Sequence, residues 1–159
     1  MKEIARLIAE AHRTGHKVLI CGNGGLAAEA EHFAADLMGR FGKGVFIPCI
    51  ALTANTSLLT ALSNDYGYEE VFAHQVRVLG QRGDILLAMT TSASSNIIRA
   101  LKAGKEVGLK TVCFCGPSSP DFEADFIFRS NTEDAPAAIQ QDMLSVLHYI
   151  AYNAKRELM

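Results

Sequence analysis

The segment that most constrains the fold is a glycine turn set between an apolar run and a helical pattern. Residues 17–21 (KVLIC) are mostly apolar, residues 22–25 read GNGG, and the residues that follow have helical periodicity as far as Asp36. A strand, a glycine turn and a helix in this order form an anion site, because glycines let the backbone approach a ligand and the helix N-terminus offers unpaired N–H groups. The segment therefore predicts a strand–turn–helix unit that binds a phosphate or a similar anion.

The rest of the chain repeats this alternation of apolar runs with helical periodicity. Strands are expected at residues 17–21, 45–52, 84–89, 110–115 and 125–129. Helices are expected at residues 2–13, 26–39, 55–63, 69–79, 95–107 and 134–158. Strands separated by helices predict an α/β fold, a three-layer αβα sandwich around a five-stranded parallel, flavodoxin-like sheet. Because no repeat, low-complexity tract or linker interrupts the pattern, we expect a single domain over residues 1–159.

Composition and charge exclude several classes of protein. Hydrophobic residues make up 49% of the chain and charged residues 20%, which indicates a compact fold and argues against disorder. A formal net charge of −2 leaves no electrostatic footprint for nucleic acid. No secretory signal is visible, and no apolar run approaches the roughly 18 residues of a membrane span. We therefore expect a cytoplasmic protein that binds neither nucleic acid nor a membrane.

The glycine turn also matches the spacing of a dinucleotide-binding fingerprint, Gly22-x-Gly24-x-x-Ala27. That fingerprint requires an acidic residue at the end of the second strand, where it binds the ribose of the cofactor. Residues 41–57 contain neither aspartate nor glutamate, and the chain has no G-K-[ST] of a P-loop. We therefore interpret the turn as a site for a phosphosugar or a similar phosphate.

A second loop is rich in hydroxyl groups. Residues 90–95 read TTSASS, directly after the third expected strand and before a helix. In a parallel sheet the loops that follow the strands share the carboxyl edge, where ligands bind. Ser and Thr are also favoured as ordinary helix N-caps. The density of short donors beside a helix N-terminus nevertheless favours phosphate binding.

Three polar side chains share one face of the helix expected at residues 26–39. His32 and Asp36 lie four residues apart and can address one point, while Glu29 on the same face could equally supply the acid. Gln140 and His148 lie on one stripe of the closing helix. Two histidines, a carboxylate and an amide oxygen could hold a divalent metal such as zinc. The alternatives are a hydrogen-bonded pair on a helix surface and a buried core histidine, because spacing alone does not show that the two helices meet.

Five motifs cover nearly the whole chain. They are CGNGG at residues 21–25, HFAADLMGRF at 32–41, NDYGY at 64–68, GDILLAMTTS at 83–92, and IQ followed by a histidine over 139–148. Together they resemble the sugar isomerase (SIS) domain family, and within it the phosphoheptose isomerase subgroup. The resemblance implies an aldose–ketose isomerase that converts sedoheptulose 7-phosphate to D-glycero-D-manno-heptose 7-phosphate through an enediol. It also implies a place in heptose biosynthesis of the kind that feeds lipopolysaccharide.

The resemblance further assigns roles to residues at matching positions. The substrate, a phosphorylated seven-carbon sugar, would be contacted by Asn23, Gly24, Gly25, Asp36, Asn64, Asp65, Thr90, Thr91, Ser92, Ser94, Ser95 and Gln140. One zinc ion per subunit would be bound by His32, Asp36, Gln140 and His148. Asp36 and His148 would also be the catalytic pair that shares the proton transfers. The family forms homotetramers with sites at subunit interfaces, and we expect the same here.

The chain departs from the family pattern at several positions. Leu26 stands where the family has serine, Ala93 where it has glycine and Asp36 where it has glutamate, and the hydroxyl loop is one residue shorter. Two non-catalytic alternatives therefore stay open. A regulator that binds a phosphosugar without turnover is favoured by Leu26. A SIS protein that binds a partner protein is disfavoured by the presence of both His32 and His148.

Overall fold

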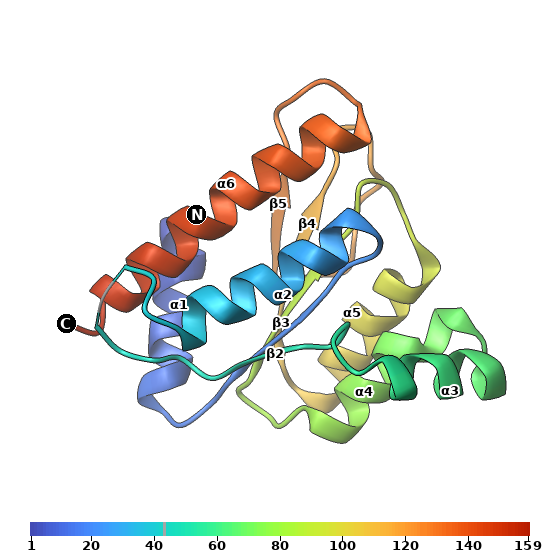
Figure 1. Cartoon of the computed structure of the whole chain (residues 1–159), viewed down its shortest axis with the longest axis horizontal. Coiled ribbons are helices and arrows are strands. Elements are labelled where there is room, and N and C mark those ends of the chain that lie inside the picture. The colour runs from blue at the N-terminus through green and yellow to red at the C-terminus, as the bar shows by residue number, and fades with distance from the viewer. Residues whose placement is uncertain (43) are drawn as a thin grey trace.

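The computed structural model describes residues 1–42 and 44–159, which build a five-stranded sheet covered by helices on both faces (Figure 1). The strands are β1 (Val18–Cys21), β2 (Cys49–Ala51), β3 (Ile85–Met89), β4 (Lys110–Cys115) and β5 (Phe126–Arg129). They lie in the order β2-β1-β3-β4-β5, and each neighbouring pair is parallel. The predicted αβα sandwich with a flavodoxin-like parallel sheet is confirmed.

Two hydrophobic cores hold the three layers together. On one face lie α1 (Lys2–Arg13), α2 (Gly25–Met38) and α6 (Pro136–Arg156), and on the other α3 (Thr56–Tyr66), α4 (Val71–Leu79) and α5 (Ser95–Val107) (Figure 1). Side chains alternate between the two cores along each strand, as the pleat requires, so that Ile20 packs on the first face and Leu19 on the second. Burial on both sides explains why β1 and β3 are continuous apolar runs.

The closing helix α6 lies beside α2 along one face of the sheet (Figure 1). Both helices begin at the carboxyl edge of the sheet and run back across it, so they are parallel. At their far end the buried Lys155 donates a hydrogen bond of 2.7 Å from Nζ to the carbonyl oxygen of Gly39, which follows the last turn of α2. Although α6 has 21 residues, neither it nor any other helix in the described part of the chain has the length and apolar character of a membrane span.

Two elements, β2 and α3, differ by three or more residues at one end from their predicted bounds, and the others differ by at most two. β2 spans only Cys49–Ala51, because Pro48 has no N–H to donate to the sheet and the N–H of Ile47 bonds to the carbonyl oxygen of Leu37 instead of to a strand. Helix α3 continues to Tyr66, three residues beyond the expected end, and stops at Gly67, whose φ of 88° lies in the left-handed region. A short 3₁₀ turn, η1 (Tyr68–Glu70), then leads into α4.

The strand order places the topological switch point of the sheet, called the crevice below, between the carboxyl ends of β1 and β3. These neighbouring strands lead to connections that leave in opposite directions along the sheet, because α2 leads to β2 and α5 leads to β4. Ligands of parallel α/β sheets bind outside the carboxyl ends of the strands at such a point. The glycine turn before α2 and the hydroxyl loop before α5 therefore face each other across it.

Asp84 anchors the opposite, amino edge of the sheet. Its fully buried carboxylate accepts hydrogen bonds from the Lys17 ammonium at 2.5 Å, from the Lys17 backbone N–H at 3.0 Å and from the Gln81 N–H at 2.9 Å. Burial alone would raise the pKa of Asp84, but the hydrogen bonds from Lys17 and Gln81 outweigh it and lower the pKa below its ordinary value.

We expect Asp84→Asn to lower the free energy of unfolding by about 2–3 kcal/mol near neutral pH, because a neutral amide leaves Lys17 without a counter-charge. Since the folded-state pKa is lowered, this stability is present above the ordinary aspartate pKa and is lost as the pH falls through the folded-state value. Urea unfolding at several pH values measures both effects. The control is Asp121→Asn, which changes an aspartate with a 99% exposed side chain, and equal losses in the two variants would contradict the prediction.

Candidate functional site

The glycine turn is built so that the backbone of α2 starts next to α6. Gly24 has a φ of 58°, and the helix begins at Gly25 with its first bonds from the N–H groups of Leu26 and Ala27 to the carbonyl oxygens of Asn23 and Gly24. A Cβ atom at Gly25 would overlap the side-chain oxygen of Gln140. The missing side chain therefore makes room for the carboxamide of α6 at the N-terminus of α2.

The hydroxyl loop is organised around Thr90. This buried residue accepts a hydrogen bond on Oγ1 from the backbone N–H of Ser92 at 3.2 Å, and its hydroxyl lies 3.3 Å from that of Ser94, the N-cap residue of α5. Ser92 and Ser95 are exposed, and Thr91 is half-buried. The loop thus presents exposed hydroxyl groups beside a helix N-terminus, an arrangement suited to a phosphate.

A pair of asparagines joins the two loops across the crevice. Asn23 Nδ2 donates to Asn96 Oδ1 at 2.9 Å, and Asn96 Nδ2 donates to Asn23 Oδ1 at 2.9 Å. The hydroxyl of Tyr68 donates to the same Oδ1 of Asn23, also at 2.9 Å. Sequence reasoning had assigned no role to Asn96 or Tyr68. Tyr68 is the last residue of the NDYGY motif at residues 64–68, and Asn96 directly follows the hydroxyl loop.

Residues from α2 and α6 meet at one point farther along the two helices. His32 Nε2 and His148 Nε2 lie 3.0 Å apart, and each lies 3.5 Å from Asp36 Oδ2. The imidazole of His148 is also held between the ring of Phe41, stacked at 5.4 Å between centroids, and the edge of His32 at 5.0 Å. Phe41 is a site neighbour that sequence reasoning did not identify, although it ends one of the five motifs.

This cluster fits a divalent metal such as zinc. Tetrahedral zinc with ligand distances of about 2.0–2.2 Å separates its donor atoms by about 3.3–3.6 Å, close to the distances within the cluster of His32, Asp36 and His148. Asp36 Oδ2 is shielded from solvent and has no hydrogen-bond partner within residues 1–42 and 44–159. A cation would satisfy this buried oxygen, because a carboxylate oxygen without a partner is costly to bury.

Three other predicted site residues, Gln140, Asn64 and Asp65, make their observed contacts elsewhere. Gln140 lies beside Gly25, eight positions before His148 on α6, which is an axial rise of about 12 Å. Asn64 and Asp65 are exposed on the last turn of α3, where the amide of Asn64 donates to the Asp65 carboxylate at 2.9 Å. The assignment of Gln140 to the metal and of Asn64 and Asp65 to the substrate therefore remains a prediction.

Glu29 is a second carboxylate on the face of α2 that carries the cluster. It lies between Gly25, which touches Gln140, and His32, which meets His148. Its Oε2 atom is buried and finds no hydrogen-bond partner in the described part of the chain. Burial raises the pKa of Glu29 to about 7. A carboxyl group with such a pKa is suited to the role of alternative acid that the sequence predicts.

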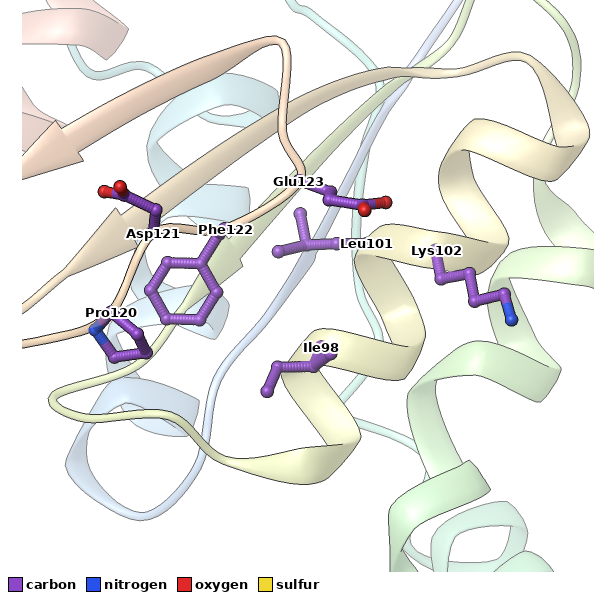
Figure 2. Close-up of a pocket in the computed structure, with 7 residues that line it drawn as sticks. All are labelled: Ile98, Leu101, Lys102, Pro120, Asp121, Phe122 and Glu123. Carbon is purple, nitrogen blue, oxygen red and sulfur yellow. The ribbon is translucent and has the colours of Figure 1, made fainter.

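A hollow of about 390 Å³ lies elsewhere, between α5 and the segment that joins β4 to β5 (Figure 2). Figure 2 shows that Ile98, Leu101 and Lys102 of α5 line it together with the segment from Pro120 to Glu123. None of the predicted site residues takes part in it. The hollow is therefore distinct from the sites at the crevice and between α2 and α6.

Comparison with known proteins adds independent information. A family model described as the SIS domain matches residues 1–116. The phosphoheptose isomerase of Synechocystis sp. is 42% identical over 99% of this chain and 83% of its own. Two solved structures share the fold. Phosphoheptose isomerase GmhA from Neisseria gonorrhoeae has a TM-score of 0.84 at 35% identity over 92% of this chain and 80% of its own. A phosphoheptose isomerase from Francisella tularensis has a TM-score of 0.89 at 31% identity over 96% and 83%.

We expect Glu29→Gln to stabilise the metal-free protein at alkaline pH. Because the folded-state pKa is raised, the contribution of Glu29 to stability is complete below its ordinary pKa and is lost as the pH rises through about 7. The neutral glutamine does not incur this loss, so its advantage should grow from about pH 4 to about pH 8. A pKa raised from 4.5 to about 7 corresponds to about 3 kcal/mol, and solvent screening of this half-exposed side chain reduces the expected advantage to about 1 kcal/mol. Chemical unfolding across this range, with the exposed Glu31→Gln as control, measures it. Parallel pH profiles for Glu29→Gln and the parent would contradict the prediction.

Proposed function

The chain belongs to the SIS-domain family and, within it, to the phosphoheptose isomerases, and on this premise we propose that it interconverts sedoheptulose 7-phosphate and D-glycero-D-manno-heptose 7-phosphate. The observation that carries the proposal is the convergence of His32, Asp36 and His148 from α2 and α6. Two of these residues, His32 and Asp36, lie on α2, and the N-terminus of α2 forms part of the crevice. One chain thus combines phosphate-binding loops with a set of proton-transfer groups.

The two ends of the substrate would be bound at different points along α2. The phosphate is assigned to the N-termini of α2 and α5, where backbone N–H groups and the exposed hydroxyls of Ser92 and Ser95 are available. The carbonyl end is assigned to His32, Asp36 and His148. Gly25 and His32 are about 10 Å apart along the helix axis, a separation that suits an extended sugar phosphate.

Aldose–ketose isomerisation moves a proton between C1 and C2 and needs groups that can accept and return it. Asp36 and His148 are proposed to share these transfers, since the carboxylate oxygen and the imidazole nitrogen lie 3.5 Å apart and can act on adjacent atoms. Phe41 and His32 hold the plane of the His148 ring. The side chain of Asp36 is only 12% exposed, so bulk water has little access to its carboxylate.

Zinc belongs to the same proposal. His32, Asp36 and His148 would hold it, with Gln140 as the fourth ligand that the resemblance implies. When bound, the ion would supply positive charge that stabilises a developing negative charge on a substrate oxygen.

The assembly and the biological setting are proposed on the same basis. They are a homotetramer with sites at subunit interfaces, a cytoplasmic location and a role in the heptose supply for lipopolysaccharide. The non-catalytic alternatives lose support, because the first relatives in the comparison bear the names of isomerases over nearly the whole chain.

We expect His148→Ala to lower kcat for sedoheptulose 7-phosphate by about 100-fold or more, since general acid–base groups commonly contribute that much. His148 is 38% exposed, so its loss should leave the fold intact. The matched control is His12→Ala, on the last turns of α1. A colorimetric or NMR assay of the heptose product measures both variants, and normal turnover of His148→Ala would refute the assignment.

Metal analysis tests the zinc part without relying on turnover. Purified parent protein is expected to contain about one zinc per chain, and His32→Ala to contain far less, because a structural or catalytic zinc site needs at least three protein ligands. A chelator should remove the metal and the activity together, and added zinc should restore both. Zinc-free parent protein with full activity would exclude this role for the cluster.

A further inference from the structure

The side chain of Asn23 has nearly all of its hydrogen-bonding capacity occupied by protein. A carboxamide oxygen can accept two hydrogen bonds, and a carboxamide nitrogen can donate two. Both acceptor positions of Asn23 Oδ1 are filled, by Asn96 Nδ2 and by the Tyr68 hydroxyl, each at 2.9 Å. One of the two N–H groups is used on Asn96 Oδ1 at 2.9 Å. A single N–H donor therefore remains for any ligand in the crevice.

We propose that Asn96 and Tyr68 are positioning residues that fix the Asn23 carboxamide as a one-donor contact for an oxygen of the phosphorylated sugar. This inference rests on the proposed function. It adds the direction of the hydrogen bond to the ligand. Asn23 held in this way can donate a hydrogen bond to the ligand but cannot accept one from a sugar hydroxyl. It also identifies two residues outside the expected binding set that control the contact.

The burial of Asn96 indicates that its pairing with Asn23 is needed for the stability of the fold. Asn96 is 2% exposed, in the first turn of α5, and its carboxamide would be costly to bury without partners. Two reciprocal bonds with Asn23 satisfy it. Since Asn23 follows β1 and Asn96 follows β3, the pair spans the crevice where a ligand is expected.

Tyr68 is held beside Asn23 by a second set of contacts. Arg99, one turn after Asn96 on α5, contacts Glu70 at 2.5 Å and Glu69 at 3.7 Å. These ion pairs tie η1 to α5, and Tyr68 is the first residue of η1. The helix that carries Asn96 thus also sets the position of Tyr68, so both partners of Asn23 are positioned by α5.

Tyr68→Phe is the decisive variant, because it removes one hydroxyl from an exposed ring and should not disturb folding. We expect KM for sedoheptulose 7-phosphate to rise about three- to tenfold, as for the loss of one hydrogen bond, with kcat changed less than about twofold. The matched control is Tyr66→Phe, whose exposed ring stacks on His74. KM should be unchanged in this control. Equal KM values for Tyr68→Phe and Tyr66→Phe, or a fall in kcat at unchanged KM, would overturn the proposal.

Asn96→Asp provides a stronger perturbation at the other partner. It keeps an acceptor for Asn23 Nδ2 but places a carboxylate oxygen against Asn23 Oδ1, so the rise in KM should exceed that of Tyr68→Phe. A thermal melt of each variant shows whether it is folded at the assay temperature. A smaller effect in folded Asn96→Asp than in Tyr68→Phe would contradict the arrangement of donors and acceptors.

Calorimetric titration separates this inference from the proposed function. Binding of sedoheptulose 7-phosphate to the parent without turnover would refute the isomerase activity, while a weaker Kd in Tyr68→Phe than in Tyr66→Phe would still support the role of Tyr68. Inorganic phosphate used as the probe identifies the acceptor. If its Kd weakens in Tyr68→Phe, the acceptor is a phosphoryl oxygen, and if only sugar phosphate binding weakens, it is a sugar oxygen. A parent that binds neither compound would refute both proposals.

Discussion

The pairing of α2 with α6 is the contact on which the metal cluster depends. The two helices lie side by side as parallel neighbours, and polar or small residues meet at three points along them. Gly25 meets Gln140, His32 and Asp36 meet His148, and the carbonyl of Gly39 accepts from Lys155. Each contact is separated from the next by about two turns on both helices. A shift of one helix by a single turn would break all three at once, so the register of this pair sets the distances within the cluster.

The contact between the C-terminal ends of α2 and α6 also explains how a buried lysine is tolerated. Lys155 is 1% exposed, and burial lowers its pKa, while the carboxylate of Asp36 acts in the opposite direction. Its ammonium donates to a carbonyl beyond the last turn of α2, where the helix dipole is negative. The same contact closes the C-terminal end of α2, so the cation that stabilises the helix also lies within electrostatic reach of Asp36. Fold stability and the charge of the candidate site are thus linked through one residue.

Residues that act within one element could be predicted from the sequence, and residues that act across elements could not. The spacing of His32 and Asp36 places them on one face of a helix, and the alternation of runs predicts a parallel sheet covered on both faces. That His148 meets them depends on the packing of two helices from distant parts of the chain. The role of Asn96 has no spacing signature, because two carboxamides can pair wherever backbones approach. The shortened β2 reflects Pro48, whose effect depends on which neighbour its missing N–H would have faced.

Leu26 shows how a departure from the family pattern is accommodated in three dimensions. The side chain is 2% exposed and belongs to the core beneath α2, and its Cβ lies where a side chain at Gly22 would have to fit. A leucine there exchanges the hydroxyl of the family's serine for apolar packing that anchors the start of α2. The glycine turn then offers a ligand only backbone N–H groups and the one free donor of Asn23. With fewer donors available at this turn, the orientation of the Asn23 carboxamide matters more, and that orientation is set by Asn96 and Tyr68.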